Sequence, residues 1–544
     1  MRSLRPFGAD GAFQRAENTK DLRLTAVRGA GATILSSGLG LVVQIASTVI
    51  LARLLTPGDF GLVTMVTTFS LLLVNFGLNG FTEAILQCET LDRYVVSNLF
   101  WINLGAGLFL TLGFAGAGSL LAHFYRDARV ANVAVSVSAS ILITSLAVQH
   151  LALLKRAMRF SVVSANDVLS KAMAVGVSVL LAWAGWGYWA LVAGTIAQAL
   201  TTTLGAWILC RWIPSLPRRV KGTADMVRYA MHVYGRFSVN YFARNMDNLL
   251  VGWRFNAQAL GFYKKAYDLF ALSGSQLVAP LTSVAVSALS RLQRDSAQYR
   301  RYLLNALAVM AFVGMGIGAD LTLIGKDVIR ILLGPGWEPS GKIFMYFGPG
   351  IGMMLLYGTH SWIHLSIGRA DRWFRWGMIE LAVTVLLFLL GLHWGPVGIA
   401  VAWTASFWLL SLPAFWYAGQ PIGLGIGPVV RAVWKFLIGS LFAGGAAVAL
   451  LSRIPGLTAF PGPRGSALRI VIASGVFLVL YLGTVILLYG GLAPIRLVTG
   501  LLRDMLPRSK RSELAPAIGV TCEMVSEIPA DEALSISCRC RKCG

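Results

Sequence analysis

Two ionisable residues in one helical segment are the first candidates for chemistry in this chain. Arg244 and Asp247 lie three residues apart, so on a helix they share a face and can form an ion pair. A charge in the middle of a membrane costs about 2.5–3.5 kcal/mol on insertion scales and needs a partner or water. The pair is therefore expected either to line a water-filled path or to close a contact between helices.

Uncharged polar side chains and one carboxylate extend this candidate path. They are Gln44, Asn75, Asn79, Glu83, Asn240 and Tyr241. Asn75 and Asn79 share one helical stripe because they are four residues apart. Gln44 lies 200 residues before Arg244, so two halves of the chain offer a polar group at matching depth. We expect these residues to form a polar cavity wall, with the alternative that Glu83 only reaches the lipid headgroups.

No pattern of a known catalytic centre or metal site accompanies these residues. His360 and His364 share a helical face, but neither an HExxH pattern nor a third ligand is present. Cys538, Cys540 and Cys543 lack the second paired cluster of a zinc module. There is no phosphate-binding GxxxxGK[ST] loop and no nucleophile with its base. The sequence therefore predicts a protein that is not an enzyme and has no cofactor.

The elements that must position these residues are membrane helices. The chain is 56% hydrophobic and 13% charged, with a mean hydropathy of +0.68, whereas soluble domains average about 25% charged residues. A span needs roughly 20 apolar residues, and about fourteen segments meet or nearly meet that length. They are 29–52, 61–86, 97–122, 130–152, 169–185, 187–210, 236–253, 266–290, 303–324, 343–367, 376–392, 396–417, 432–452 and 469–490. The predicted fold class is an all-α integral membrane protein.

The basic residues report topology. The formal net charge is +23, yet lysine and arginine fall in short clusters between apolar segments, so we expect no nucleic-acid partner. Alternate loops carry about 34 against about 12 of them, which places the richer set and both termini in the cytoplasm. The poorer, outer set is Arg53, Arg126, Arg129, Arg254, Lys264, Lys265, Lys326, Arg330, Lys342, Arg453, Arg464 and Arg469.

An internal repeat organises the segments. Residues 51–66, LARLLTPGDFGLVTMV, are echoed by residues 251–267, VGWRFNAQALGFYKKAY, with Gly61 in register with Gly261. Such repeats are typical of transporters built from two bundles that enclose a ligand site. We therefore predict two six-helix bundles related by a pseudo-two-fold axis along the membrane normal, followed by two extra helices.

The predicted organisation follows from these segments. It comprises a basic cytoplasmic tail (1–28), a first lobe (29–210), a cytoplasmic linker (211–235), a second lobe (236–417), two further helices (432–490) and a cytoplasmic tail (491–544). The repeated turns carry Arg53, Arg254, Lys264 and Lys265, which would meet an anionic headgroup if the turns line the central cleft. The alternative is that they are solvated loop charges.

Several motifs together resemble a known family. They are LARLLTPGDFGLVTMV, FGLNGFTEAILQ at the end of the second segment, RNMDNLLVG (244–252), ALGFYKKAYDL (259–269), Ala279-Pro280 and SRLQRD (290–295). Over roughly residues 25–490 the chain is similar to the polysaccharide transporter family, the Wzx-type flippases of the MATE/lipid-flippase superfamily. Within it, the chain most resembles exopolysaccharide and succinoglycan transport proteins.

The resemblance implies a substrate and a location. The substrate would be a polyprenyl-pyrophosphate-linked oligosaccharide, flipped across the bacterial inner membrane by alternating access for exopolysaccharide, O-antigen or capsule synthesis. Membrane lipids and the polymerase and export machinery would be its partners. Arg244 and the basic turn residues would hold the pyrophosphate, while the asparagines, Tyr241 and Gln44 would face sugars. A multidrug or cation antiporter, a cell-wall lipid-precursor flippase and a membrane-embedded glycan polymerase remain as alternatives.

Overall fold

The computed structural model describes residues 4, 6–8, 11–13, 19–88, 91–454, 462–492 and 496, with backbone alone for residues 19–34, 273, 275–277, 279–280 and 283. All helices named below belong to one compact unit, residues 1–494. The expected tail from residue 497 onward, with Cys538, Cys540 and Cys543, lies outside the described residues. At the other end, the backbone of Leu4 pairs with that of Cys210.

The described residues are helical almost throughout and contain isolated bridges rather than strands. The first half holds α1 (Thr19–Leu54), α2 (Pro57–Asn75), η1 (Phe76–Phe81), α3 (Thr82–Gln87), α4 (Arg93–Gly116), α5 (Gly118–Tyr125), α6 (Arg129–Ser145), α7 (Val148–Arg156), α8 (Phe160–Trp183) and α9 (Tyr188–Leu209). The second half holds α10 (Thr223–Arg254), α11 (Ala257–Arg291), α12 (Ser296–Leu333), α13 (Glu338–Gly358), α14 (His360–Ser366), α15 (Ala370–Gly391), η2 (Leu392–Trp394), α16 (Gly395–Gly419), η3 (Gln420–Ile422), α17 (Ile426–Leu451) and α18 (Gly462–Tyr489). The all-α prediction is confirmed.

Ten helical stretches of the described residues are long and apolar enough to cross a membrane. They are Leu35–Leu54, Pro57–Gln87, Arg93–Gly116, Arg129–Arg156, Phe160–Trp183, Tyr188–Leu209, Ser296–Leu333, Ala370–Ile422, Ile426–Leu451 and Gly462–Tyr489. The expected fourteen segments all lie on helices, but α10, α11 and α13 with α14 are not among the ten, and α15 with α16 counts as one stretch. The chain is a multi-pass membrane protein.

Glycine and proline set several helix boundaries where the sequence predicts them. Gly185 and Gly187, which separate α8 from α9, have φ values of +81° and +54°, in the left-handed region that glycine adopts without a steric penalty. Gly395, with φ +72°, likewise separates η2 from the body of α16. Both expected turns within long apolar runs are therefore present.

Two segments differ from a simple helical span. The predicted segment 61–86 is interrupted by the π-helix η1, between α2 and α3. The glycine run around Pro349 lies inside α13, where a Cβ on Gly348 would come within 2.2 Å of the Thr322 hydroxyl on α12. Likewise, a Cβ on Gly350 would come within 2.6 Å of the Thr404 hydroxyl on α16. The run lets α13 pack closely against both neighbours.

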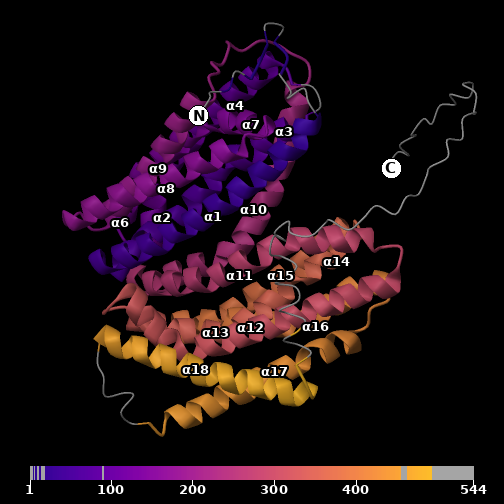
Figure 1. Cartoon of the computed structure of the whole chain (residues 1–544). Helices are drawn as coiled ribbons and strands as arrows, with labels where there is room; N and C mark the ends of the chain where they lie inside the picture. Colours follow the sequence, from indigo (N-terminus) through magenta and orange to yellow (C-terminus); the bar gives the residue numbers. More distant parts are fainter. Residues whose placement is uncertain are drawn as a thin grey trace, which may run out of the picture. The chain divides into compact units, whose positions relative to one another are not determined.

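The helices pack mainly with neighbours from their own half of the chain (Figure 1). In the first half, α1 contacts α8, α8 contacts α9, and α6 contacts α2, α4 and α9. In the second half, α13 contacts α11, α12 and α16, while α17 and α18 contact α12. Contacts between the halves include those of α2 with α11, α1 with α12, and α10 with α2, η1 and α3. These inter-half contacts bring the repeated turns together.

Candidate functional site

The two repeated turns have the same backbone construction. α1 ends at Leu54 and α2 begins after Thr56, whose hydroxyl accepts a hydrogen bond from the Asp59 amide at 3.3 Å. The second turn follows 200 residues later: α10 ends at Arg254, and the Asn256 side chain accepts from the Ala259 amide at 2.8 Å. Such N-caps satisfy amide groups that the first helical turn leaves without a partner. Both helices that follow therefore start at a fixed residue.

The paired helices touch backbone to backbone through two glycines. A Cβ on Gly61 would lie 1.6 Å from the carbonyl oxygen of Ala257, and a Cβ on Gly261 would lie 1.8 Å from the carbonyl oxygen of Pro57. Real Cβ atoms do not approach an oxygen so closely, so both positions require glycine. The offset of 200 residues applies to both members of each contact (57 and 257, 61 and 261). The contact is therefore reciprocal, and we call these four residues the glycine interlock.

The end of α1 is held by the second half of the chain. The Trp337 indole N–H donates to the Ala52 carbonyl oxygen at 2.9 Å, and the Arg53 guanidinium donates to the Ile331 carbonyl oxygen at 2.9 Å. Arg53 was expected to offer its charge to an anionic headgroup. In this structure one of its N–H groups instead ties α1 to the last turn of α12.

The corresponding end of α10 is covered by the first half. A Cβ on Gly252 would lie 2.8 Å from the ring of Tyr125, and Trp253 stacks on Phe124 with ring centroids 6.3 Å apart. Phe124 and Tyr125 form the last turn of α5. Each turn is thus covered by a helix end from the opposite half.

A cavity of about 420 Å³ opens beside the interlock. It is lined by Thr56, Pro57, Gly58, Asp127, Arg129, Asn256, Ala257 and Gln258. The Arg129 guanidinium donates to both carboxylate oxygens of Asp127, at 3.0 and 2.8 Å. This hydrogen bonding lowers the pKa of the Asp127 carboxyl. The charges at the mouth of the cavity therefore neutralise one another.

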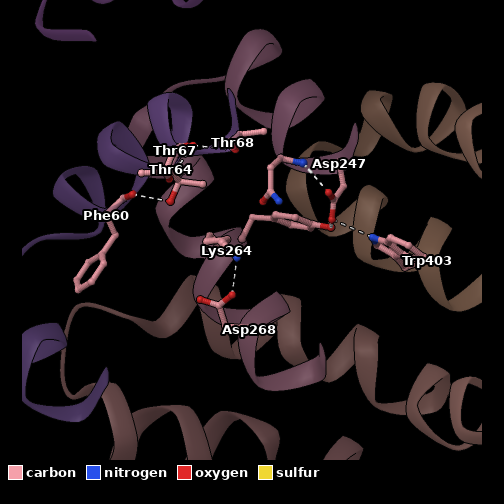
Figure 2. A network of polar contacts seen from close by, with 10 residues as sticks. Phe60, Thr64, Thr67, Thr68, Asp247, Lys264, Asp268 and Trp403 are labelled. Atoms are coloured by element: carbon pink, nitrogen blue, oxygen red, sulfur yellow. Dashed lines mark hydrogen bonds and ion pairs between the residues drawn. The ribbon is translucent and has the colours of Figure 1, made fainter. Parts of the chain in front are cut away.

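Asp247 lies at the centre of a buried polar network (Figure 2). Its side chain is fully buried and accepts hydrogen bonds from the Tyr263 hydroxyl at 2.7 Å, the Trp403 indole N–H at 3.0 Å and the Asn248 amide at 2.7 Å. The donors come from α10, α11 and α16. Charge-assisted bonds of this kind stabilise a buried carboxylate that would otherwise be costly. Asp247 thus joins three helices of the second half.

Arg244 is not the partner of Asp247. Among the ion pairs of the described residues, none joins these two side chains, which corrects the pairing expected from their spacing. Arg244 is exposed and interacts electrostatically with Tyr267 on α11 and Glu380 on α15. Glu380 lies near the Tyr357 hydroxyl. The guanidinium therefore lies near polar groups of two other helices.

Near the interlock, α2 and α11 carry different polar groups at equivalent positions. Lys264 pairs with Asp268 at 2.5 Å on α11, and Lys265 lies over the Phe60 ring with its ammonium 4.0 Å from the ring centroid. On α2, the hydroxyls of Thr64 and Thr68 donate to carbonyl oxygens one turn earlier, at 2.7 and 2.8 Å. Both predicted lysines thus contact groups of the protein in this structure.

The remaining predicted site residues are spread over several helices. The Tyr241 hydroxyl of α10 donates to the Thr68 carbonyl oxygen at 2.8 Å, and Asn79 donates to the Asn75 side chain at 2.7 Å within α2 and η1. Exposed side chains form a second set. They are Gln44, Glu83, Asn240 and Arg254. The structure brings Tyr241, Asp247, Lys264 and Lys265 near the contact of α2 with α11, and it does not gather the others there.

Sequence analysis missed two members of the Asp247 network. Tyr263 lies in the repeated motif that the analysis quoted, sixteen residues after Asp247, and an aromatic hydroxyl among lysines was a usable signal. Trp403 lies on α16, and no local pattern connects it with α10. His360 and His364, which share a helical face, are both buried.

The chain is similar in sequence to curated proteins of polysaccharide biosynthesis. The chain is 23% identical over 369 residues to the teichuronic acid biosynthesis protein TuaB of Bacillus subtilis (strain 168), covering 66% of this chain and 75% of the relative. It is 21% identical over 379 residues to the succinoglycan biosynthesis transport protein ExoT of Rhizobium meliloti (strain 1021), covering 70% and 77%.

A solved structure shares the fold. The lipid II flippase MurJ in an inward closed conformation superimposes with a TM-score of 0.67 at 16% identity, covering 84% of this chain and 98% of that one. The family model described as "Polysaccharide biosynthesis protein" matches residues 50–342, which is more than half of the chain and includes both repeated turns and the Asp247 region. This chain therefore belongs to the polysaccharide biosynthesis protein family.

Proposed function

We propose that the protein is a flippase that moves a polyprenyl-pyrophosphate-linked oligosaccharide from the cytoplasmic to the periplasmic leaflet of the inner membrane. Family membership and the names of the two relatives support a substrate used in polysaccharide synthesis. A pyrophosphate with polar sugars cannot enter hydrocarbon unaided, so such a protein must offer a wet cationic path. The lipid tail can stay in the bilayer meanwhile.

The observation that carries this proposal is the placement of Arg244. Its guanidinium is exposed on α10, yet it interacts with side chains of α11 and α15. An arginine facing hydrocarbon would be costly, whereas one between helices and in contact with water is stable and ready to bind phosphate oxygens in a bidentate manner. We propose that Arg244 binds the pyrophosphate of the substrate.

The proposed architecture follows the repeat. We infer fourteen spans, arranged as two six-helix bundles with a pseudo-two-fold axis along the membrane normal and two further helices, with both termini in the cytoplasm. The reciprocal offset of 200 residues at the glycine interlock supports the two-fold relation. The surplus of basic residues in alternate loops supports the orientation.

Alternating access is the proposed mechanism. With the glycine interlock formed, α2 and α11 meet at the end that carries the repeated turns and close the path there. Separating the helices would expose the carbonyl oxygens of Pro57 and Ala257 to water. Because the contact is made of backbone and short side chains, it can part without breaking a buried ion pair, which would cost about 3–5 kcal/mol.

We propose roles for the other predicted residues from their positions on the helices. Arg254, exposed at the end of α10, is the second candidate for the pyrophosphate, and Asn240 lies one turn before Arg244 on the same helix. Gln44, Asn75, Asn79, Glu83 and Tyr241 are assigned to the sugar-facing wall. The antiporter alternative requires carboxylates for cation coupling, for which Glu83 and Asp247 are the candidates. Both oxygens of Asp247 already accept hydrogen bonds, and Glu83 is exposed.

Arg244→Ala tests the function directly. In cells that still make the lipid-linked repeat unit, we expect polymer export to fall at least about tenfold, because a charge-assisted bond of about 1.5–3 kcal/mol to the pyrophosphate is lost. The lipid-linked unit should accumulate in the inner leaflet. Arg244→Lys should restore only part of the activity, since it keeps the charge but not the bidentate geometry.

Arg228→Ala is the matched control, because Arg228 is another exposed arginine of α10, near its start. Protein amount in the membrane must be equal in all strains. Normal export by the Arg244→Ala variant, at normal protein level, would reject the assignment of Arg244.

A further inference from the structure

A second cavity, lined by none of the residues of the glycine interlock, lies at the junction of α12, α13 and α18. Its volume is about 360 Å³. It is lined by Lys326, Asp327, Ile329, Arg330, Gly334, Glu338, Lys342 and Arg469. Four of these eight side chains are cationic and two are anionic. None of the residues assigned to the substrate path above lines this cavity.

Both acidic groups of this cavity already have partners. The Asp327 carboxylate accepts hydrogen bonds from Arg469 Nε at 3.0 and 3.1 Å and from Nη2 at 2.5 Å, and both side chains are about four-fifths buried. The Glu338 carboxylate accepts from the Gly336 amide at 3.3 Å. Asp327 and Arg469 therefore form a neutral pair that fixes α18 against α12.

Three cations remain without an acidic partner. Lys326, Arg330 and Lys342 are exposed, and none of them takes part in an ion pair among the described residues. Lys326 and Arg330 share one face of α12 because they are four residues apart. Lys342 lies in the first turns of α13, whose amino-terminal end adds a partial positive charge. The cavity is therefore electropositive and suited to an anion.

The wall that holds these cations is closely packed. A Cβ on Gly341 would lie 3.3 Å from the Cα of Lys326, so α12 and α13 approach closely at this point. Gly334 has φ +91° and ends α12, which turns the chain back toward α13. The three cations therefore project from a fixed corner rather than from a long loop.

The cavity lies at the expected boundary of the membrane. Its lining residues fall at the ends of the apolar segments 303–324, 343–367 and 469–490 or just outside them. It opens at the end of the molecule that carries the repeated turns, because Gly334 lies beside Arg53, its built Cβ being 3.6 Å from that side chain. Four of the twelve cations predicted on the outer side line this one cavity, although the outer side is poor in basic residues.

Exposed apolar side chains lie on α18 close in sequence to Arg469, which lines the cavity. They are Leu468 and Val471, which are 44% and 70% exposed. A ligand that bridges both surfaces needs an anionic group and a hydrocarbon chain. Inorganic phosphate satisfies only the first of these surfaces, whereas an anionic phospholipid satisfies both.

We propose that the α12–α13–α18 cavity binds the phosphate group of an anionic membrane phospholipid. The headgroup phosphate lies among Lys326, Arg330 and Lys342, and an acyl chain runs along Leu468 and Val471 of α18. The site makes α18, one of the two helices beyond the twelve of the repeat, a lipid-anchored support for α12. This proposal does not depend on which substrate the protein transports.

Titration of the purified full-length protein in detergent, followed by native mass spectrometry, tests the site. The probes are phosphatidylglycerol, zwitterionic phosphatidylcholine and inorganic phosphate, with no polyprenyl lipid present. We expect tighter binding of phosphatidylglycerol than of phosphatidylcholine. Lys326→Gln, Arg330→Gln and Lys342→Gln together should weaken it by about fivefold per cation, since one basic residue near an anionic lipid surface contributes about 1 kcal/mol.

The matched control neutralises Arg126, Arg453 and Arg464, three cations of the same predicted side that do not line the cavity. Equal weakening in the control, or unchanged binding in the triple variant, overturns the proposal. Displacement of the lipid by inorganic phosphate at equal concentration would reassign the site to free phosphate. Should the triple variant lose its folded melting transition, Lys342→Gln alone must still weaken phosphatidylglycerol binding several-fold, and unchanged binding overturns the proposal.

Discussion

At the repeated turns, the two halves of the molecule have matching backbones but different side chains. At the repeated turns, both helices start after a side-chain N-cap and meet through the glycine interlock. Only slightly further along, Thr64 and Thr68 of the first half correspond to Lys264 and Asp268 of the second. The first pair donates to its own helix, and the second forms an ion pair.

The same contrast extends to the helices before the turns. Asp247, with its buried network, corresponds to Ser47 of α1, and exposed Arg244 corresponds to Gln44. The first half therefore presents neutral hydroxyl and amide groups where the second presents charges. The comparison teaches that the halves share the shape of their contact, while at these four positions only the second half carries charged groups, as the proposed anionic substrate would require.

The largest effect is expected at the glycine interlock. Gly61→Ala and Gly261→Ala each place a Cβ within 2 Å of a backbone oxygen that cannot move without shifting a helix. Overpacking costs about 1–3 kcal/mol, and here it falls on the contact between the halves. We expect each variant to lower the melting temperature in detergent and to reduce export about tenfold or more, since a 1.4 kcal/mol change alters an equilibrium tenfold.

Gly58→Ala is the control, because its Cβ would make only an ordinary 3.7 Å contact with Thr56. The comparison predicts effects of similar size at positions 61 and 261. A large loss at one position with none at the other would show that the reciprocal contact is not shared equally.

The next largest effect is a difference in stability between alanine substitutions at Asp247 and at the equivalent Ser47. Asp247→Ala leaves the buried Tyr263 hydroxyl and Trp403 indole N–H without their acceptor, at about 1–3 kcal/mol for each group. Ser47→Ala should change stability by no more than about 0.5 kcal/mol. Thermal unfolding of both variants in the same detergent measures the difference, and equal shifts would contradict the asymmetry.

A smaller effect on stability is expected when the second half is given the residues of the first. Lys264→Thr with Asp268→Thr removes a partly exposed ion pair, which contributes roughly 0.2–1 kcal/mol. We expect a nearly unchanged melting temperature and a several-fold lower export rate, because the proposed path loses a cation. Full export would mean that the charge asymmetry near α2 and α11 has no role in transport.

The smallest effect concerns Asp127 at the cavity beside the turns. Its hydrogen bonds with Arg129 lower the pKa of the carboxyl in the folded state, so the stabilisation is present at neutral pH and is lost as pH falls through that lowered pKa. Asp127→Asn should therefore lower the free energy of unfolding at pH 7 by less than about 1 kcal/mol. The melting temperature should fall slightly. At pH 3 the difference from the unchanged protein should shrink, and a growing difference would contradict this account.

The helices and the repeat could be predicted because they depend on local patterns. Apolar length marked the spans, glycine marked the turns at 185–187 and 395, and the register of Gly61 with Gly261 followed from the repeated motif. Each of these features is determined by a short segment of the sequence. They required no knowledge of which distant segments meet.

The buried network and the π-helix could not be predicted because they depend on distant contacts. Helical spacing made an Arg244–Asp247 pair possible, but Asp247 is bound by Trp403, 156 residues away. In η1, a Cβ on Gly80 would lie 2.9 Å from the Ala230 carbonyl oxygen on α10, a neighbour that no local pattern reveals.

The glycine interlock also restricts how the two halves can change over time. Each glycine is required by a carbonyl oxygen of the opposite half, so neither half can acquire a side chain at that position while the other keeps its backbone path. A hybrid protein that joins the first half of this chain to the second half of a relative should assemble only if the relative has glycine at the position equivalent to 261. The two halves must therefore change together at these positions.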